Sequence, residues 1–155
     1  AKYIVAALEE YKKGTRKHPS MRGIAGSMTD QDMADVAAYY EALGETKGAA
    51  ALPPPHQPSA AVTALLQKGA CVSCHGENFN KPIDPSYPKI AGQYPDYLYA
   101  ALVAYKDNSN ATWGRGNPIM AGMAKQFSNA ELKAIAKYIG ALPREIKTVQ
   151  QSDFR

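Results

Sequence analysis

The chain has 155 residues, of which 45% are hydrophobic, and carries a formal net charge of +4. This length suits one ordinary domain or two small ones, and the hydrophobic content is sufficient for a buried core. No segment approaches the roughly 20 apolar residues of a membrane span, and the basic residues form no single run, so the charge alone does not indicate a nucleic-acid partner.

Two helices are predicted in the first 44 residues. Residues 3–13 place apolar side chains at the i, i+3, i+4 and i+7 positions of an amphipathic helix. A polar loop over residues 15–27 follows. Thr29 and Asp32 then have the spacing of a capping box, and the helix that they begin runs to Gly44. Its predicted apolar face is Met33, Val36, Ala37 and Tyr40.

The composition changes between this helix and the next. Residues 45–58 are rich in glycine, alanine and proline, and Pro53-Pro54-Pro55 favours an extended, semi-rigid linker. We interpret His56 as a solvated linker histidine. Residues 59–69 predict a helix with Ser59 as its N-cap, and this helix leads directly into the next motif.

The stretch Cys71-Val72-Ser73-Cys74-His75 has the spacing of a c-type haem attachment motif. Each cysteine would add across one haem vinyl group, and His75 would supply a neutral imidazole nitrogen as the proximal axial ligand of the iron. The alternatives are a local disulfide, a redox dithiol or half of a zinc site. Zinc would need two more ligands, but the chain has only two cysteines, and its spare histidines, His18 and His56, lie far away in sequence. A thioredoxin-like dithiol would need a βαβ context, which the sequence does not show.

Two further helices are predicted after the motif. Residues 76–92 read as a loop, and Pro95 opens a helix whose apolar positions are Leu98, Ala101, Leu102 and Tyr105. A long loop over residues 107–126 precedes Ser128, which forms a second capping box with Glu131. The helix begun there carries the apolar stripe Leu132, Ile135, Ala136 and Ile139, and the chain ends in a predicted polar tail over residues 143–155.

The first 44 residues match the C-terminal part of the chain. Residues 3–8 align with residues 97–102, and the two capping boxes coincide. After a loop five residues longer in the second copy, the matched pairs are Pro19 with Pro118, Met21 with Met120, Gly23 with Gly122, and Tyr39 with Tyr138. Because the haem motif precedes only the second copy, residues 1–44 look like the back half of a haem domain whose front half is absent from this chain. A degenerate domain that never held haem fits less well, since half a core would leave two helical stripes uncovered.

The repeat also distinguishes the candidates for the second axial ligand. Met120 and Met123 both lie in the loop before the last helix, but Met120 aligns with Met21, whereas Met123 aligns with Ile24, which cannot bind iron. We therefore expect Met120 to bind the iron and Met123 to be a packing residue. Met21 would bind a first haem attached outside this chain. The two remaining methionines are expected in the core, namely Met28 and Met33.

Trp113 and Arg115 lie in the loop that is longer in the second copy. An indole N–H and a guanidinium could both bind a haem propionate. The alternative is a surface arginine and a tryptophan that only fills space. We expect that neither residue has a counterpart in the first copy.

Taken together, the chain resembles the class I c-type cytochromes, and more closely the cytochrome c4 family of two tandem haem domains. The likeness is carried by the haem motif, by the helix over residues 97–105, and by Tyr87-Pro88-Lys89-Ile90-Ala91-Gly92-Gln93, Asn117-Pro118-Ile119-Met120 and Ser128-Asn129-Ala130-Glu131-Leu132. The resemblance implies that the carbonyl of Pro88 accepts a hydrogen bond from Nδ1–H of His75, and that the helices begun at Pro95 and Ser128 pack across one another.

The fold implied is all-α, the class I cytochrome c fold in two tandem domains of which the first is only the C-terminal half. The expected division of the chain is a half-domain, a linker, a complete domain and a tail, at residues 1–44, 45–58, 59–142 and 143–155.

The predicted function is electron transfer by a covalently attached c-type haem with His/Met ligation, cycling between Fe(III) and Fe(II) in a di-haem periplasmic carrier that is not an enzyme. One haem c is attached to this chain, and a second is expected with the missing N-terminal part. Nothing at the start reads as a signal peptide, so we expect Ala1 to be a mature, processed or truncated N-terminus.

The expected partners are redox proteins that bind a mildly basic surface, because residues 59–155 carry eleven basic and seven acidic side chains. No nucleic-acid partner is expected, and peripheral membrane association stays open. Two alternatives remain. The chain could be a haem-bearing subunit of a dehydrogenase complex, for example a flavin-linked one, or a haem sensor or enzyme with an open sixth site.

Overall fold

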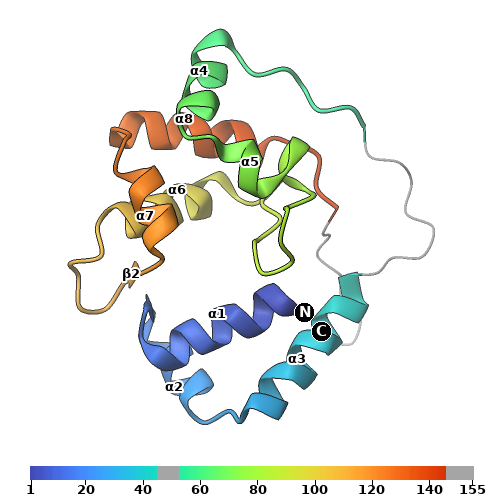
Figure 1. The fold of residues 1–155 in the computed structure, drawn as a ribbon, viewed down its shortest axis with the longest axis vertical. Coiled ribbons are helices and arrows are strands. Elements are labelled where there is room, and N and C mark those ends of the chain that lie inside the picture. Colours follow the sequence, from blue (N-terminus) through green and yellow to red (C-terminus); the bar gives the residue numbers. More distant parts are fainter. Residues whose placement is uncertain (45–52, 146–155) are drawn as a thin grey trace, which may run out of the picture.

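The computed structural model describes residues 1–44 and 53–145. Its helices are α1 (Lys2–Lys13), α2 (Pro19–Gly26), α3 (Asp30–Gly44), α4 (Ala60–Lys68), α5 (Cys71–His75), α6 (Pro95–Lys106), α7 (Pro118–Ala124) and α8 (Asn129–Gly140). A 3-10 turn, η1, and two short strands complete the described elements, at Glu77–Phe79 for η1, Arg16–Lys17 for β1 and Gly114–Arg115 for β2. Helices α1 to α3 lie together below the group formed by α4 to α8, and the antiparallel β1–β2 pair joins the two groups (Figure 1). Among the helices of residues 1–44 and 53–145, none combines the length and the apolar character that a membrane span requires.

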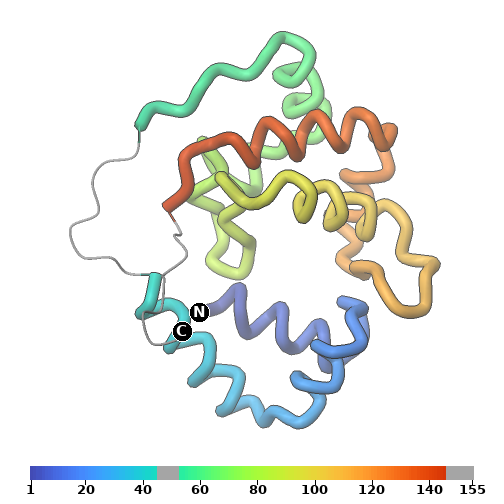
Figure 2. Tube along the Cα trace, turned by 180° about the vertical axis from the view of Figure 1, so that it is seen from behind, coloured from blue at the N-terminus to red at the C-terminus, as the bar shows by residue number. Residues whose placement is uncertain are grey.

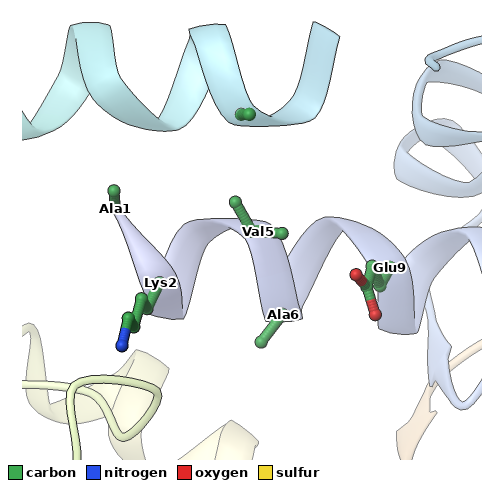
Figure 3. A pocket seen from close by; sticks show the side chains of 6 residues that line it. Ala1, Lys2, Val5, Ala6 and Glu9 are labelled. Carbon is green, nitrogen blue, oxygen red and sulfur yellow. The ribbon is translucent and has the colours of Figure 1, made fainter. Parts of the chain in front are cut away.

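Helices α1 to α3 enclose only a small core. Leu8, Ala25 and Met33 are buried in it, and Met28 packs against them, so the prediction that Met28 and Met33 are core residues is confirmed. Much of α3 remains uncovered. Tyr40, predicted on its apolar face, is 58% exposed. A shallow hollow lies on α1, and Val5 points from it toward α3 (Figure 3). This half of the chain therefore leaves apolar surface for something else to cover.

Helices α4 to α8 form the larger core. Helices α6 and α8 pack across one another, as the resemblance implied, with α4 lying against α8 (Figure 2). The predicted stripe of α8 is buried in full, and the core also takes in residues from α4, α6 and the loops, namely Leu66, Phe79, Ala91, Leu98, Phe127 and Leu142. Each leucine, isoleucine or phenylalanine of this core contributes about 1.5–3 kcal/mol on burial. Gly140 lets α8 approach the start of α6, because a Cβ there would lie 2.6 Å from Cγ of Pro95.

The two predicted long loops contain further structure, which corrects the sequence prediction. Residues 15–27 include β1 and α2, and residues 107–126 include β2 and α7. Helices α2 and α7 each begin at a proline that follows a capping side chain, His18 in one case and Asn117 in the other. With eight and seven residues, these helices are too short to show a full apolar period.

The predicted tail is also partly wrong. The carbonyl of Pro143 accepts a hydrogen bond from Nδ2 of Asn80 at 3.1 Å, and Glu145 pairs with Lys89 at 2.6 Å, so residues 143–145 are bound to the domain. His56 is exposed but lies edge-on to the ring of Tyr138 at 5.3 Å. The predicted linker residues 45–52 and tail residues 146–155 lie outside the described part.

The capping box of α8 predicts a pH-dependent contribution to stability. Ser128 N–H donates to Oε2 of Glu131 at 2.6 Å, and Glu131 N–H donates to Oγ of Ser128 at 3.2 Å. The bond from the Ser128 backbone, followed by that from its side chain, lowers the pKa of Glu131. The stabilisation is therefore complete above the ordinary glutamate pKa and is lost as the pH falls through the lowered pKa. Glu131→Gln keeps an acceptor but no charge, so the wild type should unfold at a higher temperature at pH 7, with the difference shrinking below about pH 4. Thermal unfolding by circular dichroism across pH measures this, and a difference that stays constant with pH would contradict it.

Candidate functional site

The two cysteines lie on one turn of a short helix. Helix α5 is preceded by Ala70 in the left-handed region, at φ 45°, and both thiols are half-buried. Helical geometry brings residues three apart onto the same face, so this helical turn presents both sulfurs on one side. Burial raises the pKa of the Cys71 thiol, which is the opposite of what a reactive redox dithiol needs. Among residues 1–44 and 53–145, no group of three or more His, Cys, Asp or Glu side chains could hold a metal ion, which speaks against the zinc alternative.

His75 closes α5 with one ring nitrogen already engaged. Its side chain is buried, and Nδ1 lies 3.1 Å from the carbonyl oxygen of Pro88. Because a carbonyl can only accept, Nδ1 carries the proton and Nε2 has the free lone pair. Burial lowers the pKa of His75, with the bond to Pro88 opposing it, so the ring is held neutral. A neutral imidazole with a free Nε2, beside two thiols on one helical face, fits the attachment of a c-type haem.

Gly76 makes the turn after His75 and cannot carry a side chain. Its φ is +77°, and a Cβ there would lie 1.8 Å from the carbonyl oxygen of Lys81. The loop folds back over this point, where Ile83 N–H donates to the carbonyl of Cys74 at 3.1 Å. Phe79, buried at 2% exposure, anchors the loop in the core. The position of the haem motif thus depends on close packing of the loop that follows it.

Met120 and Met21 occupy equivalent positions in equivalent helices. Met120 N–H donates to Oδ1 of Asn117 at 3.1 Å, and Met21 N–H donates to Nδ1 of His18 at 3.3 Å. In each case the methionine is the third residue of a helix that begins with proline, and both side chains are half-buried. Met123 is 36% exposed, and its sulfur accepts from Gln126 at 3.7 Å, so its predicted packing role is wrong.

Arg115 is held against two tyrosines of α6. Its Nη2 donates to the hydroxyl of Tyr97 at 2.8 Å and its Nη1 to that of Tyr105 at 3.4 Å. Trp113 is 39% exposed, and its backbone N–H is bound by Asn110. The structure thus places Arg115 in a polar cluster with Tyr97 and Tyr105, and none of its hydrogen bonds goes to Trp113.

Sequence reasoning missed Arg16, which joins the same cluster from the other half of the chain. Arg16 is 7% exposed and donates from Nη2 to the hydroxyl of Tyr97 at 3.1 Å. It faces Arg115 in the β1–β2 pair. The statement that Arg115 has no counterpart in the first copy is therefore wrong, because the register that aligns Met21 with Met120 also aligns Arg16 with Arg115. That register was the one signal in the sequence that could have found it.

The site and the fold together define a class of protein, the helical proteins that carry a covalently attached c-type haem. A sequence model of the cytochrome c family matches residues 59–143. Cytochrome c4 of Azotobacter vinelandii is 31% identical over 156 residues, which cover 91% of this chain and 72% of that protein. The chain belongs to the cytochrome c family, and it transfers electrons through a covalently bound haem c.

Solved structures resemble the chain as well. Cytochrome c4 of Acidithiobacillus ferrooxidans matches with a TM-score of 0.66 and 21% identity, over 91% of this chain and 83% of that one, a likeness that concerns the fold. The predicted all-α, class I cytochrome c fold is confirmed. Thiosulfate dehydrogenase of Marichromatium purpuratum matches with a TM-score of 0.70 and 32% identity, over 92% of this chain but 31% of that one.

Replacing Gly76 tests how closely the haem motif depends on its turn. Gly76→Ala forces a Cβ into the Lys81 carbonyl at a positive φ, so we expect less covalently attached haem per chain and a lower unfolding temperature. Gly23→Ala is the matched control, because nothing lies within 4 Å of the added carbon, alanine is the better helix former, and α2 is remote in sequence from the haem motif. Haem stain against total protein measures the first effect. Equal haem content in the two variants would contradict it.

Proposed function

We propose that the chain is an electron carrier whose iron is held between Nε2 of His75 and the sulfur of Met120. The observation that carries this proposal is the bond from Nδ1 of His75 to Pro88, since it leaves only Nε2 for the metal and fixes the plane of the ring. Cys71 and Cys74 anchor the group covalently from the same helix. When bound, the haem supplies an iron that alternates between Fe(III) and Fe(II).

Met120 is proposed as the sixth ligand because its helix is anchored at the right residue. The Asn117 cap holds the backbone of Met120 in place. The thioether therefore loses little conformational entropy when it binds iron in either oxidation state. A thioether ligand favours ferrous iron and raises the reduction potential, which suits electron transfer.

Trp113 and Arg115 are proposed to serve the haem propionates. Arg115 carries a positive charge on a guanidinium that no carboxylate of the described residues binds, and its bonded partners are tyrosine hydroxyls. The indole N–H of Trp113 is a second donor from the same loop. A carboxylate at this place would complete the cluster.

The chain's own residues then have three tasks. His75 and Met120 stay in place in both oxidation states, so that little rearranges when an electron arrives. Phe79 and the core around α6 and α8 keep water away from His75. A mildly basic surface brings an acidic redox partner to the domain by a small, salt-sensitive contact.

We further propose that residues 1–44 belong to a second haem domain of a periplasmic di-haem protein. Residues 59–142 would form the complete domain and residues 45–58 the linker, and the tail over residues 143–155 would be bound to the domain at its first three residues. Support comes from the small core of α1 to α3, the uncovered hollow on α1 and the placement of Met21 like Met120. Met21 would bind the iron of a haem attached outside this chain.

A second candidate is a haem subunit held permanently by a dehydrogenase. It is favoured by the thiosulfate dehydrogenase structure, in which 31% of a longer chain resembles 92% of this one. A partner that co-purifies through high salt would support this candidate. A chain that purifies alone and exchanges electrons with soluble acceptors would support the free carrier.

Removing the thioether tests the ligand assignment. Met120→Ala should lose the red charge-transfer band of ferric His/Met haem, bind carbon monoxide in the ferrous state, and drop in potential by more than about 59 mV, a tenfold change in the one-electron equilibrium.

Met123→Ala is the matched control, one turn away on the same helix and exposed, and it should behave as the wild type. A Met120→Ala protein with an unchanged spectrum, or a wild-type ferrous protein that already binds carbon monoxide, would overturn the assignment and favour an open-site sensor or enzyme.

A further inference from the structure

Two arginines meet at the boundary between the two halves of the chain. Arg16 of β1 stands opposite Arg115 of β2 in an antiparallel pair. The pair is tight on both sides, with Gly116 N–H donating to the carbonyl of Thr15 at 2.7 Å and Lys17 Nζ donating to the carbonyl of Asn108 at 2.7 Å. Arg16 is therefore fixed against the complete domain although it comes from the half-domain.

The cluster around the two arginines contains hydrogen-bond acceptors but no negative charge. Tyr97 accepts from both guanidiniums, and the remaining bonds of the pair go to Tyr3, at 3.3 Å from Nη1 of Arg16, and to Tyr105. Burial raises the pKa of Tyr97, but the charges of Arg115 and Arg16, together with their hydrogen bonds to the hydroxyl, outweigh burial and lower this pKa. No ion pair of the described residues involves either arginine.

One donor of Arg16 is left over. Arg16 is only 7% exposed, and its buried Nε has no hydrogen-bond partner. A buried guanidinium without a counter-ion is costly, and a second one beside it adds repulsion. Neutral hydroxyls compensate this only in part. The cluster is thus built for an anion, and a carboxylate matches the fork of a guanidinium in geometry and charge.

We propose that Arg16 and Arg115 form one shared carboxylate site, in which a propionate of the haem attached to Cys71 and Cys74 is held from both halves of the chain. This proposal rests on the proposed function, in which Arg115 binds a propionate. The new element is that the half-domain supplies the second cation, Arg16. Arg16 accordingly binds the cofactor directly and tunes the reduction potential of a haem outside its own domain. A cation at the propionate favours the ferrous state, because reduction removes one positive charge from the iron nearby.

The test is the reduction potential of the haem-loaded protein. Arg16→Gln should lower it by about 59 mV, a tenfold change in the one-electron equilibrium. Arg16→Lys keeps the charge but not the fork, and should restore at least half of the shift. Haem absorbance and circular dichroism establish whether each variant is folded. If Arg16→Gln does not fold, the potential of Arg16→Lys still decides the test.

Lys17→Gln is the matched control. It removes one positive charge from the same strand and breaks the bonds to Asn108 and Asn110, so it loosens the same boundary without touching the arginine cluster. Its potential should equal that of the wild type. An equal shift in Lys17→Gln would mean that opening of the boundary, and not the charge of Arg16, sets the potential, and would overturn the proposal.

A free anion is the other source of negative charge. Exchanging chloride for phosphate at constant ionic strength should leave the wild-type potential unchanged if the site is filled by the haem carboxylate. A phosphate-dependent shift that disappears in Arg16→Gln would assign the site to a solution anion and overturn the proposal, as would an Arg16→Gln potential equal to the wild type. The Met120→Ala spectrum is unaffected by these outcomes, so failure here is distinct from failure of the ligand assignment.

Discussion

A hydrogen bond between one ring nitrogen and one carbonyl determines how this chain can present an imidazole to iron. Nδ1 of His75 gives its proton to Pro88, and the ring cannot rotate without leaving both groups unpaired in buried surroundings. The bond ties α5 to a loop whose Ile90 N–H donates to the carbonyl of buried Phe79. The orientation of the imidazole is therefore set by the core of the domain, and the five-residue helix alone would not maintain it.

The repeat explains both the site and the boundary. Each copy begins a short helix with a capping side chain and a proline, and each holds a methionine three residues after the cap. The copies then meet through equivalent residues, since Arg16 faces Arg115. A contact of this kind is self-complementary, as in a two-fold dimer. A charge that serves one copy is consequently brought next to the same charge from the other copy.

Local signals in the sequence predict most of the fold and the core of the site. Five helices could be located because each spans two or more full turns and several carry a cap such as Ser59, Thr29 or Ser128. The sequence predicts loops where α2 and α7 lie, although His18-Pro19 and Asn117-Pro118 have the form of a capped start with proline in the first turn. Five consecutive residues suffice to identify the haem motif, because both thiols and the imidazole that attach the haem lie within them.

Contacts over long sequence separations were beyond such signals. The bond from Arg16 to Tyr97 spans 81 residues, and no apolar period or cap could point to it. Pro88 lies 13 residues from His75 and was identified through the family resemblance alone. Arg16 reads locally as one more basic residue in a polar loop.

The shared arginine site has a consequence for the way the two halves of the chain respond to an electron. If Arg16 stabilises the reduced haem of the other half, then by reciprocity reduction strengthens the hold of that half on Arg16. The contact that transmits this is short, because β1 and β2 have two residues each and Lys17 adds two bonds to backbone carbonyls. The oxidation state of the haem and the seating of Arg16 are then coupled through these few bonds, because the β1–β2 pair is what holds Arg16 beside Arg115.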